Sequence, residues 1–293
     1  MRSIIQHLRF PFSFLLLPVF LFALSSIDYV SWENAIHLFV ILHLLVYPSS
    51  NAFNSLQDQD EGSIGLIENP IRPHPALRWV SLLMDVVAIV WAYLAMDLQI
   101  AAMVLIYILV SRAYSYRRIR LKQYPILGFL SVVIFQGAWV FLLCFYGIRI
   151  HFCMGLGLCT NLAIASSFLI AAVYPISQIY QHEQDLKDGV KTMSYILGKK
   201  GTLIFSSAMS MIGFGIISFH YVQGSNWIPL LMLWSFPLPA FIFSIQWYLK
   251  IRLDESEANF KNCMKMNIIS SICMNLLFIA IIIYQNFIVN YTI

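Results

Sequence analysis

Nine apolar stretches, each about as long as a helix that crosses a membrane, run along the chain and are separated by polar segments. Such a helix needs about 20 residues to cross the roughly 30 Å hydrocarbon core of a bilayer. The narrowest separation is between the third and fourth stretches, where Asp97 and Gln99 interrupt the apolar pattern. The pattern predicts an all-α, polytopic membrane protein with nine transmembrane helices in a single bundle. The stretches cover residues 10–30, 33–53, 79–97, 99–115, 125–148, 151–176, 202–220, 227–249 and 266–289.

The composition agrees with a chain that lipid surrounds. Apolar residues make up 60% of the 293 residues and charged residues 11%, whereas soluble domains have roughly 45–50% and 25%. So few charges cannot cover a water-facing surface, which excludes a soluble enzyme, a disordered chain and a secreted disulfide-bonded domain. The five cysteines lie in or beside apolar stretches without a CxxC pair, which favours packing over redox or metal chemistry. No linker divides the chain, so we expect a single membrane domain over residues 1–293.

Lysine and arginine are distributed unevenly over the polar segments. Of the 18 basic residues, 17 lie at the N-terminus or in the segments after the second, fourth, sixth and eighth stretches, and Arg149 is the exception. Basic residues concentrate in the cytoplasmic loops of membrane proteins. We therefore expect the N-terminus and these four segments on the cytoplasmic side and the C-terminus on the outer side.

Oxygen-bearing side chains collect at the ends of the second and sixth stretches. At roughly 100° per residue, the members of each cluster share one face of a helix, and Glu183 points away from the second cluster. Either cluster alone is also typical of a polar helix terminus, but their recurrence at equivalent places, each beside a proline and a glycine, favours a shared site. Mg²⁺ is typically held by one or two carboxylates plus substrate phosphates. The expected metal ligands are Asn51, Asn54, Asp58 and Glu61 in the first cluster and Gln181, Asp185 and Asp188 in the second.

Basic residues accompany both clusters. Arg72 follows the first and Lys191 the second, and five cations lie between them in the segment SRAYSYRRIRLKQYP. Cations beside a metal-bound diphosphate stabilise a departing pyrophosphate. The positive-inside pattern explains Arg117 and Arg118 equally well, whereas the attachment of Arg72 and Lys191 to acidic clusters favours substrate binding. The expected site thus spans three cytoplasmic segments, at about residues 51–78, 112–124 and 177–200.

These motifs resemble those of the UbiA superfamily of intramembrane prenyltransferases, over essentially the whole chain. That family has nine helices, an NxxxDxxxD-type motif after the second, a Tyr-Ser plus basic segment after the fourth, and DxxxDxxxGxxT after the sixth. Asn54-Ser-Leu-Gln-Asp58 is similar to the first motif, with its last carboxylate displaced to Asp60 or Glu61. The other similar segments are Tyr114-Ser115 with Arg120-Leu-Lys122, and Asp185-Leu-Lys-Asp188-Gly189-Val-Lys-Thr192, where Gln181 replaces the usual aspartate.

The residues and the resemblance together imply a role for each motif position. Asp58, Asp185 and Lys191 are the expected catalytic residues. The expected diphosphate ligands are Arg72, Tyr114, Arg120, Lys122 and Lys191.

The implied activity is Mg²⁺-dependent transfer of an isoprenyl group from a prenyl diphosphate to a lipophilic or aromatic acceptor within the membrane. The expected partners are the prenyl diphosphate, the acceptor and membrane lipid, with no nucleic acid, and the expected location is a bacterial inner membrane. A terpene cyclase of the same fold, which needs no acceptor, is the alternative. A transporter or a binding protein fits less well, because the polar clusters lie at helix ends and no paired repeats are visible. Asp85, inside the third stretch, either pairs with a cation or orients an acceptor.

Overall fold

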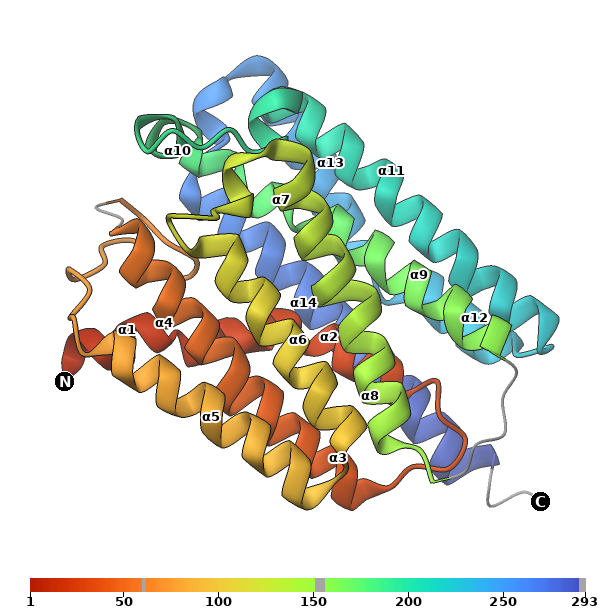
Figure 1. The fold of residues 1–293 in the computed structure, drawn as a ribbon. Coiled ribbons are helices and arrows are strands. Elements are labelled where there is room, and N and C mark those ends of the chain that lie inside the picture. Colours follow the sequence, from red (N-terminus) through yellow and green to blue (C-terminus); the bar gives the residue numbers. More distant parts are fainter. Residues whose placement is uncertain (60–61, 151–155, 290–293) are drawn as a thin grey trace.

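The computed structural model describes residues 1–59, 62–150 and 156–289, and its elements in this part of the chain are all helices (Figure 1). Nine helical stretches among these residues are long and apolar enough to cross a membrane. They correspond one to one to the nine apolar stretches of the sequence. The all-α membrane fold predicted from hydropathy is therefore confirmed.

Several spans consist of more than one helical segment, because a proline or a change of helix type divides them. The first three spans are α1 (Arg2–Leu8), η1 (Phe10–Phe12) and α2 (Ser13–Leu24); α3 (Trp32–Phe39), the π-helix η2 (Val40–Val46) and α4 (Tyr47–Asp58); and α5 (Leu77–Ala95). The next three are α6 (Leu98–Ser115); α7 (Pro125–Val132), the π-helix η4 (Val133–Trp139) and α8 (Val140–Ile148); and α9 (Leu156–Val173), η5 (Pro175–Gln181) and α10 (His182–Lys187). The last three are α11 (Met193–Gln223); α12 (Trp227–Ser235) with α13 (Leu238–Leu253); and α14 (Phe260–Ile283) with the π-helix η7 (Tyr284–Val289). The short helices η3 (Leu121–Gln123) and η6 (Glu255–Glu257) lie in loops.

The first and seventh spans begin earlier than the apolar pattern predicted. The first starts at Arg2 rather than residue 10, and the seventh at Met193 rather than residue 202. Both added turns contain basic or polar side chains, so hydropathy marks only the lipid-facing part of each helix. The seventh span also bends at Gly198, whose φ of 68° is accessible mainly to glycine.

The narrow break between the third and fourth spans is a well-defined helix start. The Asp97 side chain accepts a hydrogen bond from the backbone N–H of Ile100 at 2.7 Å. An aspartate in this position satisfies a backbone donor that the first helical turn leaves free. This cap separates α5 from α6 although only a few polar residues stand between them.

Pro18 inside α2 creates a backbone defect that a neighbouring span repairs. A proline cannot donate to the carbonyl four residues earlier, so the carbonyl of Phe14 loses its helical partner. The Ser271 hydroxyl donates to that oxygen at 2.8 Å, and the Asn275 amide reaches it at 3.4 Å. In a bilayer such groups must be satisfied within the protein, so this contact fixes α2 against α14.

A similar repair joins η4 to α9. The π-helical turn leaves the N–H of Ala138 without its α-helical acceptor, and the Ser167 hydroxyl accepts it at 3.0 Å. Gly137 permits the close approach, since a Cβ there would lie 2.5 Å from the Cα of Ser167. Small residues allow such close contact between membrane helices.

Aromatic side chains fill the middle of the bundle. The ring of Phe22 on α2 lies 5.0 Å from that of Phe141 on α8 and 4.8 Å from that of Phe278 on α14. All three side chains are almost completely buried. This cluster brings together spans that are far apart in the sequence.

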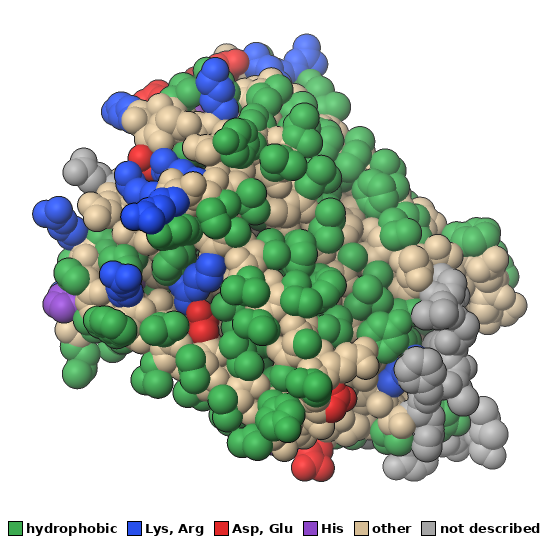
Figure 2. All heavy atoms as spheres, in the orientation of Figure 1, with side chains coloured by type: hydrophobic (Ala, Val, Ile, Leu, Met, Phe, Trp, Pro, Cys, Tyr) green, Lys and Arg blue, Asp and Glu red, His purple; other side chains and the backbone are tan. Residues whose placement is uncertain are grey.

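The surface has an apolar flank and a basic end. Hydrophobic side chains cover the flank in Figure 2, and most lysines and arginines gather toward one end of the molecule. We call this end the basic end; it consists of the N-terminus and the loops that follow α4, α6, α10 and α13. Apolar side chains exposed on the flank, such as Leu83 and Leu94 of α5, suit contact with lipid.

Candidate active site

The two acidic clusters meet at the basic end, as the sequence predicted. The Arg120 guanidinium lies between them: its Nη2 is 3.8 Å from Asp58 Oδ1 at the end of α4 and also pairs with Asp188 Oδ2 after α10. Lys122 Nζ pairs with the same oxygen of Asp58. The segment after α6 therefore joins the two motifs, because its cations contact a carboxylate from each.

A tight turn places Arg120 between the two carboxylates. Its φ of 47° and ψ of 58° lie in the left-handed region, which is uncommon for a residue other than glycine. Its Nη1 also donates to the backbone oxygen of Asp188 at 3.1 Å. Arg117 supports the turn from outside, since its Nε donates to the Gln57 carbonyl at 2.6 Å and its Nη2 lies 3.6 Å from Asp188.

A layer of neutral polar groups lies beneath these ion pairs. The Ser115 hydroxyl donates to Asn54 Oδ1 at 2.7 Å, and the hydroxyl oxygens of Tyr114 and Tyr174 are 2.5 Å apart. Asp185 lies on α10, three residues before Asp188 in the second motif.

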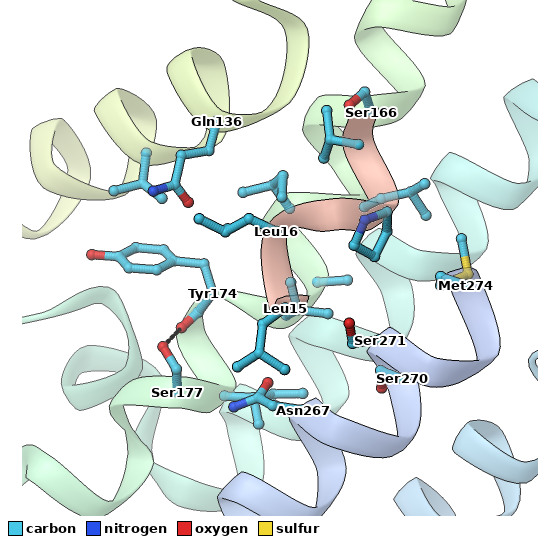
Figure 3. A pocket seen from close by; sticks show the side chains of 18 of the residues that line it. Leu15, Leu16, Gln136, Ser166, Tyr174, Ser177, Asn267, Ser270, Ser271 and Met274 are labelled. Atoms are coloured by element: carbon cyan, nitrogen blue, oxygen red, sulfur yellow. Dashed lines mark hydrogen bonds between the residues drawn. The ribbon is translucent and has the colours of Figure 1, made fainter. Parts of the chain in front are cut away.

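A cavity of about 330 Å³ adjoins this layer and extends between the spans (Figure 3). Asn54, Tyr114, Ser115 and Tyr174 form part of its lining, so they lie between the charged cluster and the cavity. The rest of the lining comes mainly from α2, α6, η4, α9, α11, α13 and α14. In Figure 3 the side chains of Leu15 and Leu16 lie between Gln136 and the residues of α14.

Arg9 is a site residue that sequence reasoning missed. It is the one charged side chain among the described residues that line the cavity, and only 9% of its surface is exposed. Its Nη2 donates to the Asn51 carbonyl at 3.3 Å, and its guanidinium lies 5.5 Å from the centre of the Phe12 ring. In the sequence, Arg9 is a cation between apolar residues. The concentration of basic residues on the cytoplasmic side accounts for such a residue without a role in the site.

The sequence profile of the UbiA prenyltransferase family matches residues 14–269, which is most of the chain. The chain belongs to the UbiA prenyltransferase family. No curated protein sequence matches it.

Solved structures of UbiA homologues share the fold over nearly the whole length. A homologue from Archaeoglobus fulgidus bound to DMAPP and Mg²⁺ is 18% identical, with a TM-score of 0.66 over 96% of this chain and 99% of that one. The same homologue bound to GPP and Mg²⁺ gives a TM-score of 0.64 at 18% identity over the same shares. A digeranylgeranylglyceryl phosphate synthase is 17% identical, with a TM-score of 0.61 over 97% of this chain and 98% of that one.

The oxygen ligands of this UbiA-family chain fit Mg²⁺ when a phosphate ligand completes them. Asp58 and Asp188 contact one guanidinium nitrogen, so the two carboxylates lie close together, and Asn54 adds an amide oxygen one turn away. Within the described residues, no three His, Cys, Asp or Glu side chains form a metal site by themselves. Mg²⁺ commonly combines one or two carboxylates with substrate phosphates, and the donors agree with that pattern.

Two of the predicted diphosphate ligands lie outside this cluster. Arg72 and Lys191 are exposed, and neither forms an ion pair with an acidic residue in the described part of the chain. The loop that carries Arg72 packs against α1: the Ser3 hydroxyl donates to the Arg72 carbonyl at 2.9 Å, and Gln6 accepts from the N–H of Ile71 at 2.9 Å. Tyr114, Arg120 and Lys122, by contrast, all lie in the constellation.

The remaining predicted metal ligands have different positions. Asn51 lines the cavity one turn before Asn54. The Gln181 amide nitrogen donates to the Ser63 carbonyl at 3.2 Å, so at least half of this amide holds a neighbouring loop. Glu61 lies outside the described residues.

Asp85 pairs with a cation, which was one of its two predicted roles. Its carboxylate forms an ion pair with Arg112 of α6 and accepts a hydrogen bond from Ser49 of α4 at 2.6 Å. Arg112 also donates to the Ser49 hydroxyl at 2.8 Å, and its guanidinium lies 4.1 Å from the centre of the Phe53 ring. The pair thus joins the spans that carry the first motif and Tyr114.

Proposed function

We propose that this chain catalyses the Mg²⁺-dependent transfer of an isoprenyl group from a prenyl diphosphate to a lipophilic or aromatic acceptor within the membrane. The observation that carries the proposal is the position of the charged cluster. Arg120 and Lys122 lie beside the carboxylates of both motifs, directly above a cavity that extends between apolar helices. A molecule with a diphosphate head and a hydrocarbon chain fits both environments.

In this proposal, the cations change partners when substrate binds. Arg120 and Lys122 pair with Asp188 and Asp58, and the diphosphate takes over that interaction. Tyr114, in the layer beneath, adds a hydroxyl at the boundary between head and chain. Arg72 and Lys191 are proposed to bind phosphate oxygens from the exposed side, which their motif positions support.

The metal ligands in the proposal are Asn51, Asn54, Asp58 and Glu61 from the first motif and Gln181, Asp185 and Asp188 from the second. When bound there, Mg²⁺ would draw negative charge from the diphosphate oxygens and so favour their departure. The bond between the prenyl carbon and the diphosphate oxygen breaks, and its electron pair leaves with pyrophosphate. A carbon of the acceptor then forms the new bond with its own electron pair and afterwards loses a proton.

The protein's residues also control where the reaction takes place. The apolar part of the cavity excludes water, which would otherwise add to the allylic cation. We propose that the basic end faces the cytoplasm and that the protein resides in a bacterial inner membrane. The uneven distribution of lysine and arginine supports that orientation.

Pyrophosphate release provides the test. The purified protein in lipid nanodiscs is incubated with Mg²⁺ and prenyl diphosphates of several chain lengths, with and without candidate acceptors. We expect release that depends on an acceptor and yields a prenylated product, and we expect Asp58→Asn to abolish it. Release with a cyclised hydrocarbon and no acceptor would indicate a terpene cyclase instead. Failure to release pyrophosphate under every condition would contradict the proposed function.

A further inference from the structure

Part of the cavity wall carries polar side chains that have no hydrogen-bond partner among the described residues. Ser166 and Ser206 are 0% and 3% exposed, and both hydroxyls are buried without a partner. The Asn267 amide is 9% exposed and also makes no hydrogen bond to the described protein. Six such residues lie on α9, α11, α13 and α14, and we call them the polar band: Ser166, Ser206, Ser210, Ser244, Asn267 and Ser270.

Most other polar residues of the lining are bonded within the protein. Ser111 of α6 donates to Ser50 at 2.9 Å, and Ser131 of α7 donates to the Gly128 carbonyl at 2.8 Å. Asn51 of α4 is an exception, because its amide nitrogen is also buried without a partner. On the side of the cavity that α9, α11, α13 and α14 form, the unpartnered groups belong to the polar band.

The α11 and α14 members of the polar band lie in the part of the cavity nearer the basic end. Along α11, Ser206 and Ser210 come first from that end, and Phe214 follows one turn deeper. Along α14, Asn267 comes first and Phe278 lies deeper. Figure 3 shows Asn267 and, one turn further along α14, Ser270 and Ser271 at one edge of the cavity. Hydrogen-bonding groups thus face the level just below the charged cluster, and aromatic rings face the deep end.

A hydrocarbon chain does not satisfy these groups. A buried hydroxyl or amide without a partner is unfavourable, so such groups normally face a ligand or water. The other wall offers apolar contacts from Leu15, Leu16 and Phe135, which suit a prenyl chain. The polar band itself contains no lysine, arginine or histidine, so it suits neutral oxygen atoms rather than an anion.

We propose that the polar band is the acceptor subsite, and that the acceptor is a neutral molecule whose hydroxyl or carbonyl groups hydrogen-bond to it. This inference rests on the proposed function, and it narrows the acceptor to a class. The acceptor lies with its oxygen atoms against Ser206 and Asn267, opposite the prenyl chain. Arg9, the charged residue of the lining, contacts Asn51 of α4 and is not part of the polar band.

Direct binding tests this proposal without any prenyl transfer. The full chain in nanodiscs is titrated calorimetrically with three probes that share one ring system: dihydroxynaphthalene, its dimethyl ether and a naphthalene carboxylate. We expect the diol to bind about tenfold more tightly than the ether, since each net hydrogen bond is worth about 1 kcal/mol and the ether cannot donate. We expect the carboxylate to bind more weakly than the diol.

Variants then assign the effect to the polar band. Ser206→Ala and Asn267→Leu should each weaken diol binding about fivefold to tenfold and leave ether binding unchanged. Ser207→Ala is the matched control, because the adjacent Ser207 hydroxyl already donates to the Leu203 carbonyl at 2.9 Å. Ser206→Ala removes a single oxygen and carries the test if Asn267→Leu does not fold.

Three results would overturn the proposal: equal binding of diol and ether, tightest binding of the carboxylate, or no binding of any probe. Equal weakening of diol and ether by the variants would also overturn it, because it would indicate a change of cavity shape. Since these titrations contain no prenyl diphosphate, they are independent of the pyrophosphate assay. A negative pyrophosphate assay with a diol preference would contradict the transferase and leave the polar band as a binding site for neutral oxygen-bearing molecules. Pyrophosphate release without a diol preference would contradict the acceptor subsite alone.

Discussion

Lys122 and Asp58 form an ion pair in which both side chains are nearly buried, with 11% and 4% of their surfaces exposed. Asp58 ends α4 and Lys122 follows α6, so the pair joins two motif segments that are far apart in the sequence. In this pair each charge neutralises the other. Removal of one partner therefore leaves a buried charge with weaker compensation, and this is costly.

We expect stability and turnover to respond differently to changes in this pair. Asp58→Asn and Lys122→Met should each lower the free energy of unfolding by about 1–3 kcal/mol. The double variant should recover most of that stability, because neither charge is then left unpaired. All three should lose at least about tenfold in turnover, equivalent to 1.4 kcal/mol in the barrier.

Thermal unfolding in detergent and pyrophosphate release measure the two effects separately. Asp185→Asn is the comparison, and it should reduce turnover to a similar extent. If the Asp58→Asn and Lys122→Met variants both retain more than about a tenth of the wild-type rate, the cluster is not the diphosphate site.

Most of the fold could be predicted from the sequence, but the environment of its residues could not. Apolar stretches locate spans because lipid exposure is a property of composition. The burial of Asp58 was not visible, since a carboxylate at a helix end is expected to be solvated, and here the turn at Arg120 covers it. The polar band was equally hidden: serine is common in membrane helices, and only the rotation of α11 and α14 shows which serines face the cavity.

Three hydrogen-bonding side chains form a chain that ends at the charged cluster. Gln178 Nε2 donates to the Tyr174 hydroxyl at 2.8 Å, and the hydroxyl oxygens of Tyr174 and Tyr114 lie 2.5 Å apart, where either can donate. We expect Tyr174 to donate to Tyr114 when substrate binds, because the Tyr114 proton is then available to another acceptor. A phosphate oxygen of the substrate is the acceptor we expect.

From this chain we expect graded effects on substrate binding. Tyr114→Phe removes the donor and should weaken prenyl diphosphate binding about tenfold. Tyr174→Phe keeps the Tyr114 hydroxyl but removes the hydrogen bond that orients it, so this variant should weaken prenyl diphosphate binding about threefold. Calorimetric titration of both variants with a prenyl diphosphate and Mg²⁺ checks the order. Equal losses, or a larger loss for Tyr174→Phe, would contradict the direction of the chain.

The Asp85–Arg112 pair should matter for stability and not for acceptor binding. Asp85→Asn leaves Arg112 partly buried with one fewer anionic partner and should lower unfolding stability by about 1–3 kcal/mol. The remaining folded protein should keep its Michaelis constants for both substrates. A specific rise in the Michaelis constant for the acceptor, with unchanged stability, would instead support the role in acceptor orientation.

The topology can be tested by labelling two engineered cysteines. Lys187 ends α10 at the basic end, and Gln223 ends α11, a helix of 31 residues, at the other end. The described native cysteines are buried and should react slowly. In a Cys153→Ser background, a membrane-impermeant maleimide should label Lys187→Cys from the cytoplasmic side and Gln223→Cys from the outer side. Labelling of both positions from one side would contradict the nine-span arrangement.

Gln181 occupies the position at which the family motif has an aspartate. Its amide nitrogen can donate a hydrogen bond, and its amide oxygen can bind a metal ion. The nitrogen donates to the Ser63 carbonyl at 3.2 Å and so holds the loop after α4 near the second motif. The oxygen takes no part in that contact. It brings a ligand atom without charge, so the second motif has one anion fewer than the usual pattern.

We therefore expect weak Mg²⁺ binding in the substrate-free protein and much tighter binding once a prenyl diphosphate supplies further oxygens. Gln181→Glu keeps the length of the side chain and adds a charge, so it should tighten Mg²⁺ binding without substrate by about tenfold. Gln181→Glu also removes the amide nitrogen that donates to the Ser63 carbonyl, and this loss should slow turnover. Gln181→Leu removes both atoms and should raise the Mg²⁺ concentration for half-maximal activity about fivefold. Calorimetric Mg²⁺ titrations with and without prenyl diphosphate, together with activity titrations, measure these effects. If neither variant changes the Mg²⁺ dependence, Gln181 only holds the loop, and the second motif coordinates the metal through Asp185 and Asp188 alone.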